Sequence, residues 1–294
     1  MTIYLNGQYM PVEEAKVSVL DRGFIFGDGV YEVIPVYSRK AFRLEEHLRR
    51  LQHSLDGIKL ANPHSNTEWT RIIGELIARN ADEDQYLYLH ITRGVARRDH
   101  AFPNPPVNPT VFMMSNSLLT PPAELLHSGI SCITAPDNRW LRCDIKAIAL
   151  LPNVLLRQMA VDAGCAETIL IRSESITPES ITEGAFMTEG AASNIFVVKN
   201  GTLLAPPKDN LMLPGITYDV VLELAAANGI PHEVRRIAVA EVFAADELLL
   251  TSSTKEVLAI TQLDGKPIGS GKPGAMFARL HALYQDFKRD VMRA

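Results

Sequence analysis

The chain has 294 residues, of which 47% are hydrophobic and 21% are charged, which is typical of a globular protein with one large or two medium domains. Its net charge of −5 gives no basic footprint, so nucleic acid is excluded as an expected partner. No apolar run approaches the roughly 18 residues of a membrane span, and the N-terminus lacks a secretory pattern. We therefore expect a cytoplasmic protein with no membrane partner.

The first part of the chain mixes strand and helix patterns. In chain order we expect a hairpin over 2–11, two strands within 29–44, helices over 43–55 and 67–80, and strands over 85–94 and 109–118. The hairpin turns at Asn6-Gly7, a dipeptide typical of two-residue turns. These elements predict an N-terminal α+β domain of residues 1–118, followed by a proline-containing linker over 119–123.

The second part shows the same mixture. The expected elements are strands over 129–136 and 167–172, two strands within 194–207, a strand over 247–254, and helices over 150–164, 215–229 and 275–292. They predict a C-terminal α+β domain of residues 124–294. Its three cysteines form no CxxC pair, which favours reduced thiols, and we expect no metal site.

Lys146 stands in an unusual place, because an unbroken apolar run follows it from Ala147 to Leu151. Moving an unpaired ammonium group out of water is costly, so a buried lysine gives up its proton or finds a partner. One interpretation is that the long stem reaches the surface or that the amine pairs with Asp144. The other is a lysine kept neutral for use as a nucleophile.

Three features favour a bound phosphate, although each has a simpler explanation. Gly215, Ile216 and Thr217 begin an expected helix, where free N–H groups attract anions, yet Thr217 could be only a helix cap. Four consecutive hydroxyl residues, 251–254, end an apolar strand, yet such residues also form ordinary turns. Arg50 could supply the countercharge, or it could belong to a solvated helix face.

The order and spacing of six motifs resemble the fold-type IV pyridoxal-phosphate enzymes. The motifs are "DRGFIFGDGVYEVIPVY", "EEHLRRLQHSL", "RWLRCDIKAIALLPNVLLRQMA", "TEGAASNIFVV", "LPGITYDVV" and "ELLLTSSTKEV". Within that group the chain looks most like the D-amino acid aminotransferases. The resemblance implies a two-domain α+β fold with pyridoxal 5′-phosphate in the cleft between domains. It also implies a homodimer in which the partner chain completes each site.

The resemblance also implies roles for single residues. Lys146 matches the lysine that holds the cofactor as a Schiff base and then carries a proton between the substrate α-carbon and the cofactor. Glu189 matches the carboxylate that keeps the pyridine nitrogen protonated. The matching phosphate contacts are Arg50, Thr217, Ser252, Ser253 and the Ile216 amide.

The expected substrate class depends on the loop "TRGVARRDHAFP". Arg98 and His100 match a pair that holds the substrate α-carboxylate in D-amino acid aminotransferases, with Tyr31 alongside. Taken without the resemblance, Arg93, Arg97 and Arg98 would be read as a solvated basic loop. The implied reaction transfers the amino group of D-amino acids such as D-alanine or D-glutamate to 2-oxoglutarate or pyruvate.

Other functions are compatible with much of the chain. Branched-chain amino acid aminotransferases and 4-amino-4-deoxychorismate lyases resemble the rest of it but lack the Arg98 and His100 pair. A binding protein built on a degenerate version of the fold is the alternative from outside the enzymes. The presence of both Lys146 and Glu189 argues against it.

The sequence departs from the family pattern in one place. The segment 174–185 is inserted before "MTEGAASN" and contains a second Thr-Glu-Gly, at 182–184. Glu183 is therefore a competing candidate for the pyridine nitrogen. We expect Glu189 instead, because it alone is followed by the small-residue turn and apolar strand "AASNIFVV". The insertion is expected to lengthen a hairpin tip, where added residues cost little.

Overall fold

The computed structural model describes residues 1–173 and 184–294, and the chain divides into two compact units. The first unit contains Met1–Leu119, Ile145–Leu150 and Met292–Ala294, and the second contains the described residues of Thr120–Asp144 and Leu151–Val291. The sequence had assigned Lys146 to the C-terminal domain. In the structure the segment that carries it belongs instead to the first unit.

The first unit is built from one mixed set of strands and helices. Its elements are β1 (Thr2–Leu5), β2 (Gln8–Pro11), η1 (Val12–Glu14), α1 (Arg22–Phe26), β3 (Gly29–Tyr37), β4 (Lys40–Ala41), α2 (Leu44–Gly57), α3 (Asn66–Arg79), β5 (Gln85–Thr92) and β6 (Thr110–Ser117). The strands form an antiparallel sheet in the order β2-β1-β6-β5-β3-β4. The expected hairpin is confirmed, since β1 pairs with β2 across a turn in which Asn6 and Gly7 both have positive φ.

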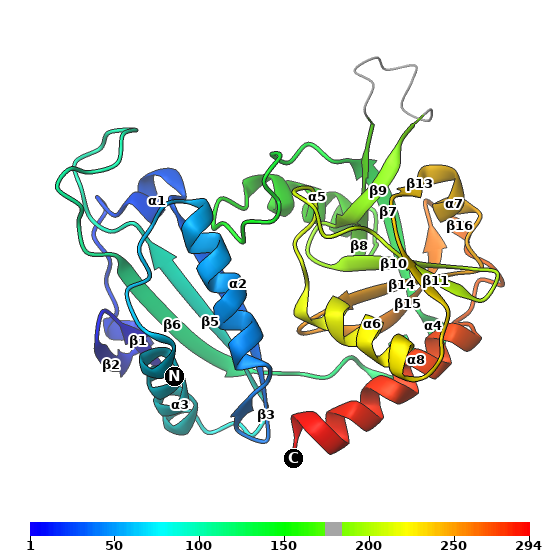
Figure 1. The fold of residues 1–294 in the computed structure, drawn as a ribbon, viewed down its shortest axis with the longest axis horizontal. Coiled ribbons are helices and arrows are strands. Elements are labelled where there is room, and N and C mark those ends of the chain that lie inside the picture. The colour runs from blue at the N-terminus through cyan, green and yellow to red at the C-terminus, as the bar shows by residue number, and fades with distance from the viewer. Residues whose placement is uncertain (174–183) are drawn as a thin grey trace. The chain divides into compact units, whose positions relative to one another are not determined.

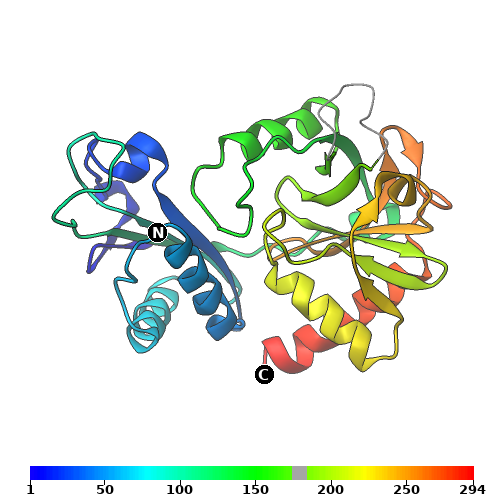
Figure 2. The same cartoon turned by 45° about the horizontal axis from the view of Figure 1, so that its top comes forward.

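One face of this sheet is covered by α2 and α3 (Figures 1 and 2). Leu48, Leu51 and Leu55 form the buried apolar stripe of α2 and pack in the core with the sheet residues Ile34 and Leu89. The helix lies there because its apolar stripe, like the inner face of the sheet, must be removed from water. The same helical face also buries three polar side chains, which lie in the candidate site.

The segment Ile145–Leu150 joins the first unit through backbone pairing with the start of β3. The Tyr31 amide donates to the Lys146 carbonyl at 2.9 Å, and the Ile148 amide donates to the Gly29 carbonyl at 3.1 Å. Val30 and Ala147 form an isolated antiparallel bridge, and Ile145 is buried in the core of this unit. These contacts are the physical reason why Lys146 is not part of the second unit.

The second unit has a larger sheet. Its elements are α4 (Ala123–Ser128), β7 (Ile130–Pro136), α5 (Leu151–Asp162), β8 (Glu167–Arg172), β9 (Phe186–Gly190), β10 (Asn194–Lys199), β11 (Thr202–Ala205), α6 (Ile216–Ala227), β12 (His232–Val234), β13 (Ile237–Ala238), α7 (Val239–Phe243), β14 (Glu247–Ser252), β15 (Glu256–Leu263), β16 (Lys266–Pro267), α8 (Ala275–Phe287) and η3 (Lys288–Met292). The described strands follow the order β12-β11-β10-β14-β15-β7-β8-β9-β13, and β16 pairs with β15. Helices α6 and α8 lie beside each other (Figure 1).

The expected long hairpin falls mainly on residues 174–183, which lie outside the described residues. The strands on either side of it, β8 and β9, are antiparallel neighbours. Glu183 also lies outside the described residues. Among the helices that the structure describes, none has both the length and the apolar composition needed to cross a membrane.

The two tryptophans of the chain provide a matched test of the first core. Trp69 is fully buried on α3, and its indole N–H donates to Asn62 at 2.9 Å, whereas Trp140 is 51% exposed. We expect Trp69→Ala to lower the free energy of unfolding by roughly 3–5 kcal/mol, because it leaves a large cavity. Trp140→Ala should change it by about 0.5 kcal/mol or less. Urea denaturation followed by circular dichroism compares the two variants, and equal losses would contradict the packing described.

Candidate active site

Lys146 and Tyr31 are brought together in the first unit. The Lys146 side chain is half-buried, and its Nζ lies 4.2 Å from the centroid of the Tyr31 ring. Its backbone is held on both sides, since its amide donates to Ser54 Oγ at 3.1 Å and its carbonyl accepts from Tyr31. The amine is therefore presented on a fixed backbone against an aromatic face.

A buried charged cluster lies on the neighbouring residues of β3 and α2. Glu32 accepts from Arg50 Nε at 2.8 Å and from Arg50 Nη2 at 2.7 Å, and its carboxylate lies 2.8 Å from His47 Nδ1. Burial opposes a charge on Glu32, but Arg50 and His47 hold the pKa of this carboxyl well below its usual range. Burial lowers the pKa of His47, and its Nε2 has no hydrogen-bond partner among the described residues.

Arg50 was predicted from the sequence as a site residue, whereas Glu32 and His47 were not. Arg50 is buried, so the alternative of a solvated helix face is wrong. The available signal was a glutamate inside the apolar strand "VYEVIPV", together with a histidine and an arginine three residues apart on one helical face. A buried carboxylate needs such partners, which is why the three residues occur together.

Arg98 and His100 lie on the loop between β5 and β6, and both approach one aromatic ring, that of Phe26. Both side chains are exposed. The Arg98 guanidinium lies 5.5 Å from the centroid of the Phe26 ring, and the His100 ring lies 5.4 Å from the same centroid. Phe26 ends α1, so a residue from an early helix organises the expected carboxylate-binding pair.

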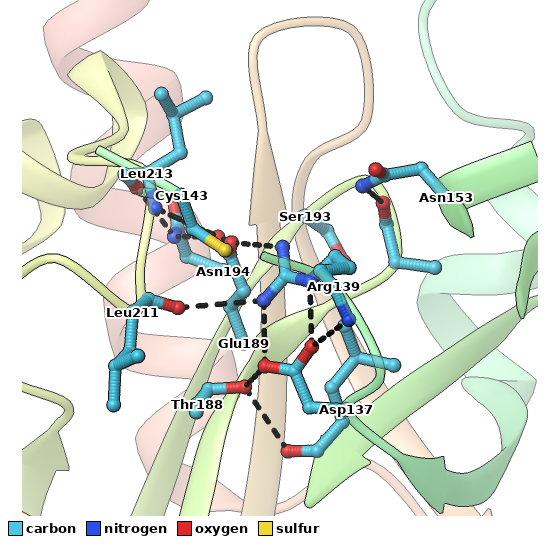
Figure 3. A network of polar contacts seen from close by, with 12 residues as sticks. Asp137, Arg139, Cys143, Asn153, Thr188, Glu189, Ser193, Asn194, Leu211 and Leu213 are labelled. Atoms are coloured by element: carbon cyan, nitrogen blue, oxygen red, sulfur yellow. Dashed lines mark hydrogen bonds and ion pairs between the residues drawn. The ribbon is translucent and has the colours of Figure 1, made fainter. Parts of the chain in front are cut away.

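Glu189 occupies the centre of a polar network in the second unit (Figure 3). Its buried carboxylate accepts from Arg139 at 2.5 Å, from Asn194 at 3.2 Å and from the Leu213 amide at 3.3 Å. Burial is the largest influence and raises the pKa of Glu189 to about 7, although Arg139 lowers it in part. A carboxyl group in this state can exchange a proton near neutral pH.

The arginine that meets Glu189 is itself shared. Arg139 donates to both oxygens of Asp137, at 2.9 and 3.0 Å, and Asp137 also contacts Arg172 and accepts from Thr188. The result is an alternating row of charges, Arg172, Asp137, Arg139 and Glu189. Arg139 was not predicted from the sequence, since an arginine two residues after an aspartate at the end of a strand is common on protein surfaces.

Asn194 connects the start of α6 with Glu189. Its N-cap is Gly215, with no side-chain cap, and Thr217 is a buried residue inside the helix, so the interpretation of Thr217 as the cap is wrong. Asn194 Oδ1 would lie 2.0 Å from a Cβ at Gly215, a distance that only glycine permits. The Asn194 side chain also donates to Glu189, so one amide connects the helix start to the buried carboxylate.

The hydroxyl run begins opposite Asn194, because β14 pairs with β10 and aligns Thr251 with Asn194. Thr251 is fully buried, and its hydroxyl has no partner among the described residues. Ser252 accepts from the Lys255 amide at 3.1 Å, and Ser253 is half-buried. The structure thus brings Glu189, the α6 start and the first hydroxyls of the run into one region of the second unit.

Comparisons with known proteins identify the family to which the chain is similar. Residues 29–263 match the model of the family described as "Amino-transferase class IV". The D-alanine aminotransferase of Bacillus licheniformis is 38% identical over 97% of this chain and 96% of its own length. That of Staphylococcus aureus (strain N315) is 37% identical over 97% of both chains.

Among solved structures, the branched-chain amino acid aminotransferase of T.th. with pyridoxamine 5′-phosphate has a TM-score of 0.87 at 27% identity. The matched region covers 100% of the present chain and 95% of the solved chain. The expected α+β fold class and the resemblance to the fold-type IV pyridoxal-phosphate enzymes are confirmed. With a family match over most of its length and near-full-length relatives, the chain belongs to the class IV aminotransferases.

Proposed function

We propose that this pyridoxal 5′-phosphate-dependent aminotransferase transfers the amino group of D-amino acids, such as D-alanine and D-glutamate, to 2-oxoglutarate or pyruvate. The observation that carries the proposal is the 36–38% identity to D-alanine aminotransferases over nearly the whole chain. The branched-chain aminotransferase structure shares the fold at a lower identity of 27%. It makes branched-chain L-amino acids the alternative substrate class.

The second unit contains groups that fit the cofactor's phosphate. The N–H groups at the α6 start, at Ile216 and Thr217, have no side-chain cap and attract an anion because the positive end of the helix dipole lies there. The buried Thr251 hydroxyl lacks a partner among the described residues, and a phosphate oxygen would supply one. We assign Ile216, Thr217, Ser252 and Ser253 to the phosphate, add Thr251 to them, and keep Arg50 as the proposed countercharge.

Glu189 fits the pyridine nitrogen. When bound, the cofactor supplies an aldehyde that condenses with amines and a pyridine ring that withdraws electrons when its nitrogen is protonated. The Glu189 carboxylate would accept a charge-assisted hydrogen bond from the protonated nitrogen, and its negative charge would keep the proton there. Asn194 and the Leu213 amide hold the carboxylate in place. The Glu189 side chain therefore has little conformational freedom left to lose when the cofactor binds.

Lys146 is proposed as the catalytic base and as the amine that condenses with the cofactor. When the cofactor is bound, the Lys146 Nζ would be the amine that meets its aldehyde, and once free it would accept and hold the proton of the substrate α-carbon. The Lys146 backbone is bound to Ser54 Oγ and to the Tyr31 amide, and these contacts restrict the positions that Nζ can reach. Tyr31, Arg98 and His100 are assigned to the substrate α-carboxylate, since a guanidinium and an imidazole together offer several donors to its two oxygens.

A homodimer is proposed as the working form. Helix α5 leaves apolar side chains exposed at helical spacing, at Leu151, Val154, Leu155 and Met159. A second copy of the chain would remove this stripe from water, as expected for a stable oligomer interface.

The same proposal places the enzyme in the cytoplasm, with small amino and 2-oxo acids as its ligands. Cys132, Cys143 and Cys165 are free thiols, which suits a reducing compartment. The net charge of −5 gives no support for a nucleic-acid partner.

Lys146→Ala should lower turnover by at least roughly a thousandfold, because it removes the condensing amine and the proton carrier together. Lys266→Ala, which changes an exposed lysine, should leave turnover unchanged. Borohydride reduction of the parent followed by peptide mapping should mark Lys146. Near-parental activity of Lys146→Ala, or a mark on another lysine, would contradict the assignment.

Glu189→Gln should slow catalysis strongly, whereas Glu183→Gln, in the second Thr-Glu-Gly, should change it little. A second measurement uses the protein without cofactor. Because the pKa of Glu189 is raised to about 7, its protonated form stabilises the fold most below about pH 4.5, and this contribution is lost as the pH rises toward 7. The free energy of unfolding of the parent minus that of Glu189→Gln should therefore decrease as the pH rises from about 4.5 to about 7. An essential Glu183 with a dispensable Glu189 would reverse the assignment.

Arg98→Ala should lower kcat/KM for D-alanine by roughly ten- to a hundredfold, equivalent to about 1.5–3 kcal/mol for one charge-assisted contact. Amines without a carboxylate should be affected far less. Assays with both enantiomers of alanine, glutamate and leucine against 2-oxoglutarate test the substrate class. A clear preference for L-leucine would move the protein to the branched-chain group, and pyruvate release from aminodeoxychorismate alone would make it a lyase.

A further inference from the structure

We propose that Arg22 is a positioning residue for substrate recognition, which holds the loop that carries Arg98 and His100 in its carboxylate-binding shape. The inference rests on the proposed function, since it takes Arg98 and His100 to bind the substrate carboxylate. It concerns α1 and the loop between β5 and β6, both of which belong to the first unit.

The Arg22 guanidinium binds three successive carbonyls of this loop. Its Nη1 donates to the carbonyl of Asp99 at 2.6 Å and to that of Ala101 at 3.2 Å, and its Nη2 donates to the carbonyl of His100 at 3.4 Å. The residues so held are His100 and the residues directly before and after it. The loop backbone therefore cannot move away from α1 without breaking several charge-assisted hydrogen bonds.

Arg22 can act as an anchor because it is itself fixed. It is only 3% exposed, and its Nε donates to Asp28 at 2.7 Å. Arg93 donates to the same Asp28 oxygen at 2.8 Å, so two guanidinium groups share one carboxylate. The Arg22 amide also donates to the carbonyl of Gly94, where the loop begins, at 2.9 Å.

The side chains of the pair are ordered by Phe26, four residues after Arg22 on the same helix. The Arg22 guanidinium lies 4.8 Å from the Phe26 ring centroid, and the Arg98 guanidinium and the His100 ring approach the same ring. Both exposed side chains therefore have one shared apolar support. An anchor for the backbone and a support for the side chains together limit the orientations that Arg98 and His100 can adopt.

Steady-state kinetics of the holoenzyme with D-alanine tests this role. Arg22→Met should raise KM by roughly tenfold with a much smaller change in kcat, because the carboxylate contacts become less well oriented. Arg22→Lys should give an intermediate rise, since an ammonium can bind only part of the loop. Phe26→Leu should also raise KM, and it provides a second test if Arg22→Met fails to fold.

The decisive comparison uses the double variant Arg98→Ala, His100→Ala as a background. There, adding Arg22→Met should lower kcat/KM by less than about twofold, because the groups it positions are absent. An equal loss in both backgrounds, or an unchanged KM in both Arg22→Met and Phe26→Leu, would overturn the inference. Arg71→Met, at an arginine exposed on α3, is the matched control and should change nothing.

The same data separate the inference from the proposed function. If the double variant leaves the KM for D-alanine unchanged, then Arg98 and His100 do not bind the carboxylate and the substrate assignment fails. If the double variant raises KM but Arg22→Met and Phe26→Leu do not, only the positioning role fails. Thermal denaturation of each variant identifies a loss of activity that follows from unfolding.

Discussion

The backbone pairing between β3 and the segment Ile145–Leu150 is the constraint on which the candidate site depends. The chain leaves β7 in the second unit, adds this segment to the first unit at Tyr31, and returns to the second unit in α5. Because β7 and β8 are parallel, a long crossover connection between them is required in any case. The protein uses that connection to fix Lys146 against a strand of the first unit, which gives a half-buried amine a rigid support.

Two buried carboxylates, Glu32 and Glu189, show how the positive charge around a carboxyl group determines its pKa. Glu32 has the Arg50 guanidinium on both oxygens and His47 beside it, and its pKa lies well below the usual range. Glu189 has one arginine, and that arginine is shared with Asp137, whose negative charge opposes ionisation. Burial then dominates, and the pKa of Glu189 rises to about 7. Glu32 is therefore suited to hold neighbouring groups in place, and Glu189 to meet a further cation.

Local signals in the sequence predicted much of the fold. The Asn6-Gly7 hairpin, the leucine stripe of α2 and the strands β5 and β6 each follow from residues close together in the chain. The short helices α1 and α7 were missed, because five residues contain too little periodicity to be recognised. The unit to which Lys146 belongs could not be predicted either, since it depends on hydrogen bonds to residues more than a hundred positions earlier in the chain.

The residues of the candidate site likewise divide into those that the sequence predicted and those that it did not. Motif resemblance named Lys146, Glu189, Arg98 and His100, each of which is a recognisable residue in a recognisable string. It did not name Arg22, Glu32 or Arg139, although they stand in the same strings, because the role of each depends on side chains and carbonyls that only the fold brings to it. A buried arginine and an exposed arginine look alike in a sequence, and only the fold distinguishes them.

The loop between β5 and β6 illustrates why such partners are needed. A surface loop is free to vary in shape and is for that reason a common place for binding residues, but the same freedom blurs the position of its side chains. Here the freedom is restricted from outside the loop, by an arginine that binds its backbone and a phenylalanine that supports its side chains. Both come from α1, a helix of five residues whose N-cap Asp21 also accepts from Thr110 at the start of β6. Because α1 is tied to the loop and to the strand that follows it, a short element can fix the positions of the two loop residues Arg98 and His100.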